Sequence, residues 1–331
     1  MGGARGELPP ARYLVTGGAG FIGSHLAEAL VKAGHRVRVL DDFSSGRREN
    51  LSGVQGGVEV IEEDVADQGV CDRACKGAEY VLHHAARVSV AESHEDPVAC
   101  DEVNAVGTLK LLSAARDAGC TRFVYAGSAS AYGNSAELPH HEEMMPRPLS
   151  PYAVAKHVGE LYCRAFSDLH GLETVVLRYF NVFGPRQDAS SPYSGVIARF
   201  IDGLIRERGV TICGDGEQTR DFVSIENVVH ANLLACTAPG AAGQIINIGS
   251  GERMSVNRLA EVLQDVMGVR AEVSRGPARQ GEVRHSVADL RRAREVLGYE
   301  VEVPVVEGLR RTVAWHRERA GADAHGPAGS G

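Results

Sequence analysis

A glycine-rich loop near the N-terminus constrains the fold of this chain more than any other feature. Gly17, Gly20 and Gly23 follow an apolar, β-like run at 13–16 and open an apolar helical pattern at 21–33. In a strand–turn–helix unit, glycines at this spacing allow a tight turn and let a pyrophosphate approach the helix N-terminus. A plain turn can give the same short pattern, but this context favours a dinucleotide. We therefore predict a cofactor loop made of Gly17, Gly20, Phe21, Ile22 and Gly23.

Short β-like runs alternate with longer helical ones up to about Gly184, which is typical of a parallel, doubly wound sheet. The predicted strands are 13–16, 36–40, 58–61, 80–83, 122–125 and 173–178, and the longer helices are 21–33, 96–119 and 150–171. We expect an α/β chain with a Rossmann-type sheet and a smaller, mixed α/β C-terminal lobe for substrate. The predicted divisions are a flexible tail at 1–11, a mainly dinucleotide-binding domain at 12–184, a mainly substrate-binding lobe at 185–318 with some strands returning to the main sheet, and a flexible tail at 319–331.

Composition and charge argue against several classes of protein. The 331 residues carry a formal net charge of −8, which disfavours a nucleic-acid-binding surface. No apolar run approaches the length of a membrane span. The 7 cysteines are scattered and odd in number, and no signal peptide is seen, so we expect free thiols and a cytoplasmic location. The run His140 to Glu143 lies in a polar loop with no further ligand set, so no metal site is predicted.

Acidic residues after the second predicted strand bear on the choice of cofactor. Asp41 lies 18 residues beyond Gly23, where a carboxylate can bind both hydroxyls of an adenosine ribose and repel a 2′-phosphate. This position favours NAD over NADP, although a carboxylate in a solvated turn is a common alternative. The other candidates on the adenosine side are Asp42, Ser44, Ser45 and Gly46 after this strand, and Asp64 and Val65 after the next one.

Tyr152 and Lys156 stand four residues apart in a predicted helix. Ser150 has the chemistry of an N-cap, and Pro151 suits the first helical position. The phenol and the ammonium group would then share one helix face. Because a nearby cation favours a phenolate, we expect the pKa of Tyr152 to fall from about 10 toward working pH. Such a base suits removal of a proton from an alcohol, although the bare spacing also occurs on solvated helices.

Several short motifs together carry a family resemblance. They are the glycine loop, His83-His84-Ala85-Ala86, the run Ser128 to Gly133, the run Ser150 to Lys156, the run Arg178 to Pro185, and the run Gly214 to Phe222. With these motifs the chain resembles the extended short-chain dehydrogenase/reductases, and among them the nucleotide-sugar 4-epimerases, over roughly residues 12–316. The resemblance implies that bound NAD takes a hydride from C4 of a UDP-sugar and returns it to the other face. It also implies a homodimer through the helices at about 101–118 and 150–170, packed as a four-helix bundle.

The resemblance also implies a role for each matching residue. Tyr152 would take the proton of the sugar 4-hydroxyl, Lys156 would hold the nicotinamide ribose, and Ser128 would share in the proton relay. The implied cofactor contacts after the fourth strand and beyond are His84, Ala85, Ala86, Asn104 and Tyr179. The implied substrate contacts are Val88, Ser130, Asn181, Val196, Arg220, Glu282 and Ser286, of which Arg220 would neutralise the diphosphate and Glu282 would hold the uridine ribose. For Arg220 and Glu282, a surface ion pair is the alternative.

The two residues after Ser128 separate the reaction classes of this family. Related 4,6-dehydratases carry Asp-Glu there, and related sugar decarboxylases carry Glu at the position of Ser130. This chain has Ala129 and Ser130, which favours epimerisation. The alternatives are another NAD-dependent nucleotide-sugar dehydratase or reductase, and a non-catalytic NAD-binding sensor.

The sugar is harder to predict than the reaction. Galactose-specific bacterial relatives carry Tyr where this chain has Ser286, so an N-acetylhexosamine is sterically admissible here. UDP-glucuronate epimerases sometimes carry Arg at the position of Asp188, which disfavours that substrate. A carboxylate could still pair with Arg87, Arg186 or Arg199, although a solvated role is the ordinary one for an arginine. The glucose, N-acetylhexosamine and glucuronate series therefore all remain open.

Overall fold

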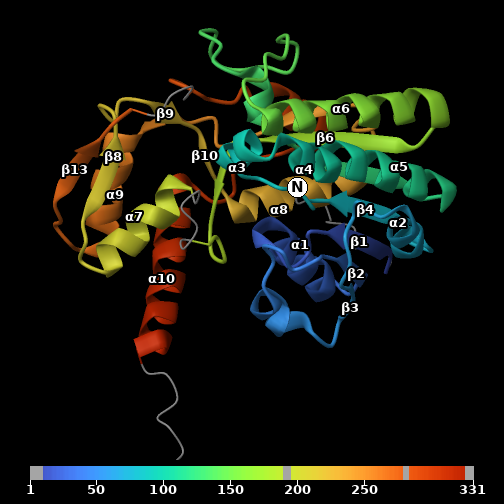
Figure 1. The fold of residues 1–331 in the computed structure, drawn as a ribbon, viewed down its shortest axis with the longest axis horizontal. Coiled ribbons are helices and arrows are strands. Elements are labelled where there is room, and N and C mark those ends of the chain that lie inside the picture. The colour runs from blue at the N-terminus through green and yellow to red at the C-terminus, as the bar shows by residue number, and fades with distance from the viewer. Residues whose placement is uncertain (1–9, 189–194, 279–282, 325–331) are drawn as a thin grey trace, which may run out of the picture.

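A parallel sheet of seven strands forms the centre of the molecule, in the order β11-β6-β5-β4-β1-β2-β3 (Figure 1). The computed structural model describes residues 10–188, 195–278 and 283–324, with the backbone alone for 322–324. The strands are β1 (Arg12–Thr16), β2 (Arg36–Leu40), β3 (Val58–Ile61), β4 (Tyr80–His83), β5 (Arg122–Ser128), β6 (Glu173–Tyr179) and β11 (Ile245–Ile248). This order confirms the predicted Rossmann-type fold. The strand β11 lies beyond residue 185 and joins the main sheet beside β6.

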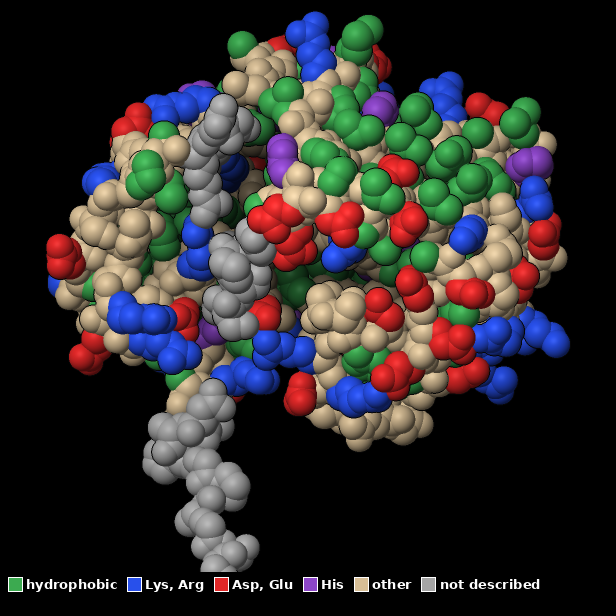
Figure 2. All heavy atoms as spheres, in the orientation of Figure 1, with side chains coloured by type: hydrophobic (Ala, Val, Ile, Leu, Met, Phe, Trp, Pro, Cys, Tyr) green, Lys and Arg blue, Asp and Glu red, His purple; other side chains and the backbone are tan. Residues whose placement is uncertain are grey.

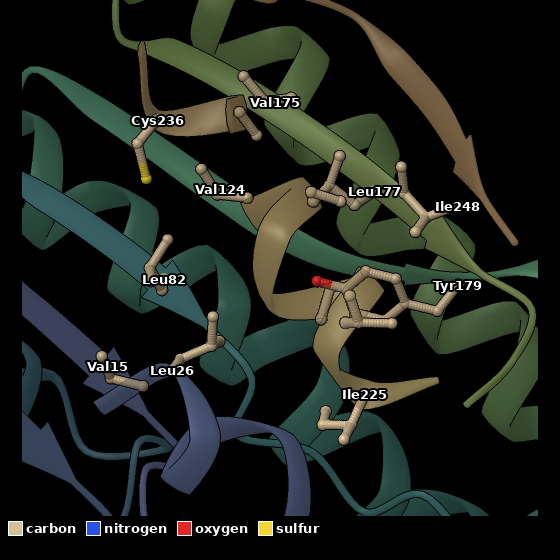
Figure 3. Packing of buried hydrophobic residues seen from close by; sticks show 14 of the residues in the cluster. Val15, Leu26, Leu82, Val124, Val175, Leu177, Tyr179, Ile225, Cys236 and Ile248 are labelled. Carbon is tan, nitrogen blue, oxygen red and sulfur yellow. The ribbon is translucent and has the colours of Figure 1, made fainter. Parts of the chain in front are cut away.

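Helices cover both faces of this sheet and bury two apolar clusters against it. Helices α1 (Phe21–Lys32) and α8 (Ile225–Thr237) share one cluster with the sheet, while α2 (Gln68–Cys75), α5 (Thr108–Asp117) and α6 (Pro151–His170) share the other. Figure 3 shows part of the first cluster, in which Leu26 of α1 lies near Leu82 of β4 and Ile225 of α8 lies near Tyr179 of β6. Because both faces of the inner strands are buried, β1, β4, β5 and β6 are nearly continuous apolar runs, whereas β3 at the edge is partly exposed. These runs are what made them predictable from the sequence.

The single helix predicted at 96–119 is wrong in its interior. The chain instead forms α3 (Val90–Glu95), α4 (Pro97–Asp101), a π-helical turn η2 (Glu102–Gly107) and then α5. The side chain of Asn104 in η2 leaves the helix surface and binds the backbone of Arg87, with Arg87 N donating to Asn104 Oδ1 at 2.8 Å and Asn104 Nδ2 donating to Arg87 O at 2.9 Å. Wide turns of this kind frequently lie at functional sites.

The smaller lobe packs around its own apolar core beside the sheet (Figure 1). Its elements are α7 (Val196–Ile205), β8 (Val210–Cys213), β9 (Thr219–Arg220), β12 (Met254–Ser255), α9 (Val256–Met267), β13 (Val273–Gly276) and α10 (Val305–Ala324). Strand β7 (Asn181–Phe183) pairs with β10 (Phe222–Ser224) where the two parts meet. The short helical turns are η1 (Arg48–Val54), η3 (Ala129–Tyr132) and η4 (Ala293–Leu297).

The two chain ends differ from the predicted tails. Helix α10 continues to Ala324, so the tail predicted from residue 319 is wrong over 319–324. Alanine is a strong helix former, and the Arg319 guanidinium lies 5.1 Å from the centre of the Trp315 ring one turn earlier. At the other end Ala11 is buried, and its N–H donates to His35 Nδ1 at 3.2 Å. Within the described part of the chain, no helix has the length and apolar character needed to cross a membrane.

Candidate active site

Strand β5 and helix α6 bring Ser128, Tyr152 and Lys156 together at the carboxyl edge of the sheet. Ser128 is the last residue of β5, and the other two occupy the first turns of α6. The predicted helix start is confirmed, because Pro151 is the first helical residue and Ala153 N donates to Ser150 Oγ at 3.2 Å. Ser128 hydrogen-bonds the Tyr152 phenol, and Ser130 Oγ donates to Ser128 Oγ at 2.8 Å. A proton on the phenol therefore has a hydroxyl partner in place.

The structure does not show the expected lowering of the Tyr152 pKa, so that prediction is wrong for the protein without ligands. Burial raises the pKa of Tyr152, and the hydrogen bond from Ser128 opposes this only in part. The Lys156 ammonium group lies over the ring of Tyr125, 4.4 Å from its centre. Lys156 is 4% exposed, and this burial lowers its pKa to about 8. The spacing in sequence could not reveal that burial would dominate both groups.

A buried ion pair orders α6 against the sheet beneath the catalytic turn. Arg178 on β6 donates to Glu160 through Nε at 2.9 Å and through Nη2 at 2.7 Å. Both side chains are almost fully enclosed, with 2% and 0% exposure. The contacts with His157 and Arg178 hold the pKa of Glu160 below its usual range although burial acts to raise it. The Glu160 charge also raises the pKa of Lys156 against the effect of burial, so this pair keeps Lys156 more cationic.

The glycine loop has the close packing that a pyrophosphate cradle requires. Gly17 has φ +63°, and a Cβ there would lie 2.7 Å from Ala85 N. A Cβ on Gly23 would lie 2.1 Å from Gly17 O, so only glycine allows α1 to start against the loop. No side chain caps the N-terminus of α1 at Gly20. The free N–H groups of the first turn, at Phe21 and Ile22, are thus available to an anion, and the residues present fit a dinucleotide.

The two aspartates after β2 have different surroundings. Asp41 is buried and accepts hydrogen bonds from Ala19 N and Phe43 N, each at 2.8 Å, and burial raises its pKa. Asp42 is exposed and accepts from both the N–H and the hydroxyl of Ser44. Asp41 therefore shapes the loop after β2. The other polar candidates form the exposed rim of this loop, namely Asp42, Ser44 and Ser45. Their contact with the adenosine ribose stays a prediction.

Two other predicted cofactor residues lie close to this rim. A Cβ on Gly46 would lie 2.6 Å from Asp41 Oδ1, so this glycine allows the loop to close on the carboxylate. Asp64 is exposed and accepts from Ala66 N at 2.8 Å. Val65 is 5% exposed and its side chain packs in the second core cluster. Only the backbone of Val65 is therefore available to an adenine.

Side chains from the core support the loop after β4. His84, Ala85 and Ala86 are half-buried, and Asn104 anchors the next residue as described above. Tyr179 was predicted to touch the cofactor, but its ring packs in the core with 7% exposure (Figure 3). Its hydroxyl lies 3.0 Å from His84 Nε2 and 2.8 Å from Asn232 Nδ2. Tyr179 thus supports His84 from the core, and its contact with the cofactor stays a prediction.

The substrate side is built by the smaller lobe. Ser286 N donates to Thr219 O at 3.1 Å, which places Ser286 beside Arg220 on β9. A hollow of about 270 Å³ lies next to them, lined by Cys213, Gly214, Asp215, Gln218, Ala278, Val283 and Arg284. At its edge Arg284 makes a bidentate pair with Asp215 at 2.8 and 2.7 Å. Glu282 lies outside the described residues, although its neighbour Val283 lines the hollow.

The remaining predicted substrate residues lie on three elements around this region. Val88 is 69% exposed in the segment after β4. Asn181 is exposed at the start of β7, and its N–H donates to Asp221 O at 2.9 Å. Val196 is the half-buried first residue of α7. Their contact with a sugar nucleotide is not tested by this geometry.

Sequence reasoning missed Asp221, which organises the substrate side. Its carboxylate is fully buried and accepts from Ser250 N, Ser250 Oγ, Gly251 N and Ala288 N at 2.7 to 3.0 Å. Asp221 directly precedes β10, and its bonds join the start of this strand to the loop after β11 and to the segment that carries Ser286. The Arg220-Asp221-Phe222 motif contained the signal, but only its arginine was given a role.

Comparison with known proteins gives the class. The family model described as "NAD dependent epimerase/dehydratase family" matches residues 13–249. A UDP-glucose 4-epimerase of Mycolicibacterium smegmatis is 39% identical over 93% of this chain and 99% of its own length. The crystal structure of the Thermotoga maritima UDP-glucose 4-epimerase with UDP-glucose is 39% identical, with a TM-score of 0.89 over 93% of this chain and 99% of that one. The UDP-N-acetylglucosamine 4-epimerase of Methanobrevibacter ruminantium M1 is 36% identical, with a TM-score of 0.90 over 94% and 100%.

The chain therefore belongs to the NAD-dependent epimerase/dehydratase family of extended short-chain dehydrogenase/reductases. Its cofactor is NAD, which agrees with the prediction from the glycine loop and Asp41.

Proposed function

We propose that this protein is a UDP-hexose 4-epimerase that inverts C4 through a transient 4-keto sugar. NAD, when bound, supplies a hydride acceptor for the C4 hydrogen and returns that hydride afterwards. Tyr152 removes the proton from the 4-hydroxyl and later restores it, with the Ser128 hydroxyl as its hydrogen-bond partner. Lys156 holds the nicotinamide ribose, and Arg220 and Asn181 bind the diphosphate. The sugar turns about this diphosphate between the two transfers.

The surroundings of Ser128 carry this proposal. Elimination of water or of carbon dioxide from the keto sugar requires a further acid or base beside the ring. The positions after Ser128 hold Ala129 and Ser130, and the hydroxyl of Ser130 is directed at Ser128. These neutral groups support an oxidation at C4 that is followed only by its reduction. They argue against a dehydratase or a decarboxylase.

A product analysis tests the proposal. Purified protein is incubated separately with UDP-glucose, UDP-N-acetylglucosamine and UDP-glucuronate, and NMR resolves the C4 epimers. Interconversion of one or more epimer pairs is the expected result. A 4-keto-6-deoxy product would identify a dehydratase, release of carbon dioxide would identify a decarboxylase, and NAD binding without turnover of any sugar would favour a sensor.

We propose that the accepted sugars include the N-acetylhexosamines. Ser286 is a small residue whose backbone is fixed against Thr219, so the space beside it is not filled by an aromatic ring. A uronate is less favoured, because Arg186 already binds Glu28 and Ser24 on α1. Replacement of Ser286 by Tyr tests this: turnover of UDP-N-acetylglucosamine should fall at least tenfold while that of UDP-glucose changes little. Equal losses on both sugars would contradict the proposal.

We also propose a cytoplasmic homodimer that pairs through α6 and the helices beside it. Figure 2 shows hydrophobic side chains gathered on the face formed by α5 and α6. Val154 and Leu161, 45% and 54% exposed, stand seven residues apart and so share one stripe of α6, with exposed Val98 and Val106 on the adjoining segments. All 7 cysteines are free thiols, which suits a reducing compartment. Light scattering should give a dimer that Leu161→Glu weakens, whereas a monomeric wild type would refute the pairing.

A further inference from the structure

A buried chain of hydrogen bonds runs under the loop after β4. Thr16 Oγ1 on β1 lies 2.7 Å from His83 Nδ1, and His83 Nε2 lies 2.9 Å from Thr108 Oγ1 at the start of α5. Thr108 Oγ1 in turn donates to Asn104 O in η2 at 2.6 Å. All four residues have at most 1% exposure. These hydrogen bonds are therefore closed to water.

Counting protons fixes the direction of every bond in the chain. Thr16 Oγ1 accepts from Ala85 N at 3.1 Å and from His84 N at 3.2 Å, a proton that it shares with Thr16 O, and His83 Nδ1 at 2.7 Å lies in place to accept from the hydroxyl. Its own proton then goes to His83 Nδ1. His83 is neutral with its proton on Nε2, because Nδ1 accepts and Nε2 is left to donate to Thr108. The short contact between Thr108 Oγ1 and Asn104 O uses the Thr108 proton.

The chain joins the two anchors of one loop. At the start of that loop, Thr16 holds the N–H groups of His84 and Ala85. At its end, the side chain of Asn104 holds both the N–H and the carbonyl of Arg87. The segment between the anchors lies against the glycine loop, since a Cβ on Gly17 would meet Ala85 N at 2.7 Å. Movement of either anchor is thus transmitted through His83 to the wall of the cofactor site.

We infer that His83, as the neutral Nε2–H tautomer, is a positioning residue that holds residues 84–87 in the shape that retains NAD. His83 is 1% exposed, so it acts on the cofactor site through the loop that it supports. The groups that face it are Thr16, Thr108, the rings of Phe123 and Tyr125, and the titratable side chains of Lys156 and His84. Both Lys156 and burial disfavour an imidazolium and hold the pKa of His83 well below its usual range. A proton on Nδ1 would face the Thr16 hydroxyl, which already accepts two N–H protons, and would break the chain.

The test removes one hydroxyl with almost no change of shape. Thr108→Val leaves His83 Nε2 without its acceptor, and Thr174→Val is the matched control. Thr174 is equally buried at 1% exposure and also donates to a backbone carbonyl, that of Cys163 at 2.8 Å, but far along β6 from the loop. Each variant is measured as the NAD-loaded enzyme, by the rate at which NAD is released into a trap. Histidine nitrogen NMR at neutral pH reports the His83 tautomer.

The expected results separate positioning from simple stability. In the wild type, NMR should show the Nε2–H tautomer. Loss of one buried hydrogen-bond partner corresponds to roughly a tenfold change in an equilibrium, so Thr108→Val should release NAD about tenfold faster. The control should lose less stability, because it loses one hydrogen bond and Thr108→Val loses two, and it should keep the NAD release rate within about twofold. His83→Gln, whose amide offers one acceptor and one donor, should release NAD more slowly than His83→Leu.

Two outcomes would overturn the inference. One is an Nδ1–H or doubly protonated His83 in the wild type. The other is an NAD release rate for Thr108→Val no faster than that for Thr174→Val. If His83→Leu does not fold, the two threonine variants and the NMR signature still decide the question.

Discussion

The loop after β4 and the edge of the hollow beside β9 are held by different kinds of interaction. Around the cofactor loop, His83 and Asn104 are about 1% exposed and bind through fully enclosed hydrogen bonds. Around the substrate hollow, the pair between Arg284 and Asp215 has side chains that are 50% and 56% exposed. An enclosed network is rigid because each member lacks an alternative partner in water. A solvated pair separates at little cost, so the side chains at the edge of the hollow can rearrange more easily than the loop after β4.

The largest effect should come from the catalytic phenol. Tyr152→Phe removes the proton acceptor while leaving the ring in place, so kcat should fall about 10³-fold or more. The cofactor side is untouched, and the variant should therefore copurify with NAD as the wild type does. Turnover is followed by NMR, and bound NAD by absorbance after acid release. A fully active Tyr152→Phe enzyme would refute the proposed mechanism.

The next effect concerns the buried ion pair under the catalytic turn. Arg178→Met leaves the carboxylate of Glu160 enclosed without its bidentate partner, and breaking a buried pair in this way costs about 3–5 kcal/mol. Urea unfolding measures the change in the free energy of unfolding. A loss below about 1 kcal/mol would show that the enclosed side of the molecule tolerates an unpaired charge, and the contrast between the two sides would fail.

Replacement of the buried Lys156 should raise the free energy of unfolding of the protein. Its pKa is about 8 in the fold against 10.5 for an ordinary lysine. Between these values the unfolded chain binds more protons than the folded one, so wild-type stability should rise with pH through this window. Lys156→Met should be inactive, should be more stable at pH 7 by on the order of 2 kcal/mol, and should lack that rise. A stability profile with the same slope in both proteins would contradict the burial argument.

The smallest effect is expected on the exposed side. Arg284→Gln breaks the pair with Asp215, and because both side chains are half exposed the free energy of unfolding should change by less than about 1 kcal/mol. The KM for the UDP-sugar should change by no more than a fewfold. Arg178→Met is the enclosed counterpart, measured under the same conditions. A destabilisation by Arg284→Gln as large as that by Arg178→Met would remove the distinction between the two sides.

Local chemistry made much of this molecule predictable. The bounds predicted for β2, β3 and β4 agree with the structure because each run of strand-forming residues begins shortly after a glycine, namely Gly34, Gly57 and Gly77, although β3 itself is not buried. The Ser150 cap and the Pro151 start were equally local signals. The pKa of Tyr152 and the core position of Tyr179 were not predictable, because both depend on burial by segments far apart in the sequence. The interior of 96–119 was mispredicted because side-chain bonds of Asn104 and Thr108 override a regular helical pattern.

The π turn at η2 has a consequence for how this chain tolerates changes in length. One additional residue in a helix rotates everything before it by about 100° relative to everything after it. In η2 that extra length is absorbed locally, so Leu111 and Leu112 of α5 keep their places in the core while Asn104 is turned toward Arg87. Removing a single residue between Glu102 and Gly107 would restore an ordinary α-helix and turn the Asn104 side chain away from Arg87. At this point of the chain, the count of residues matters as much as their identity.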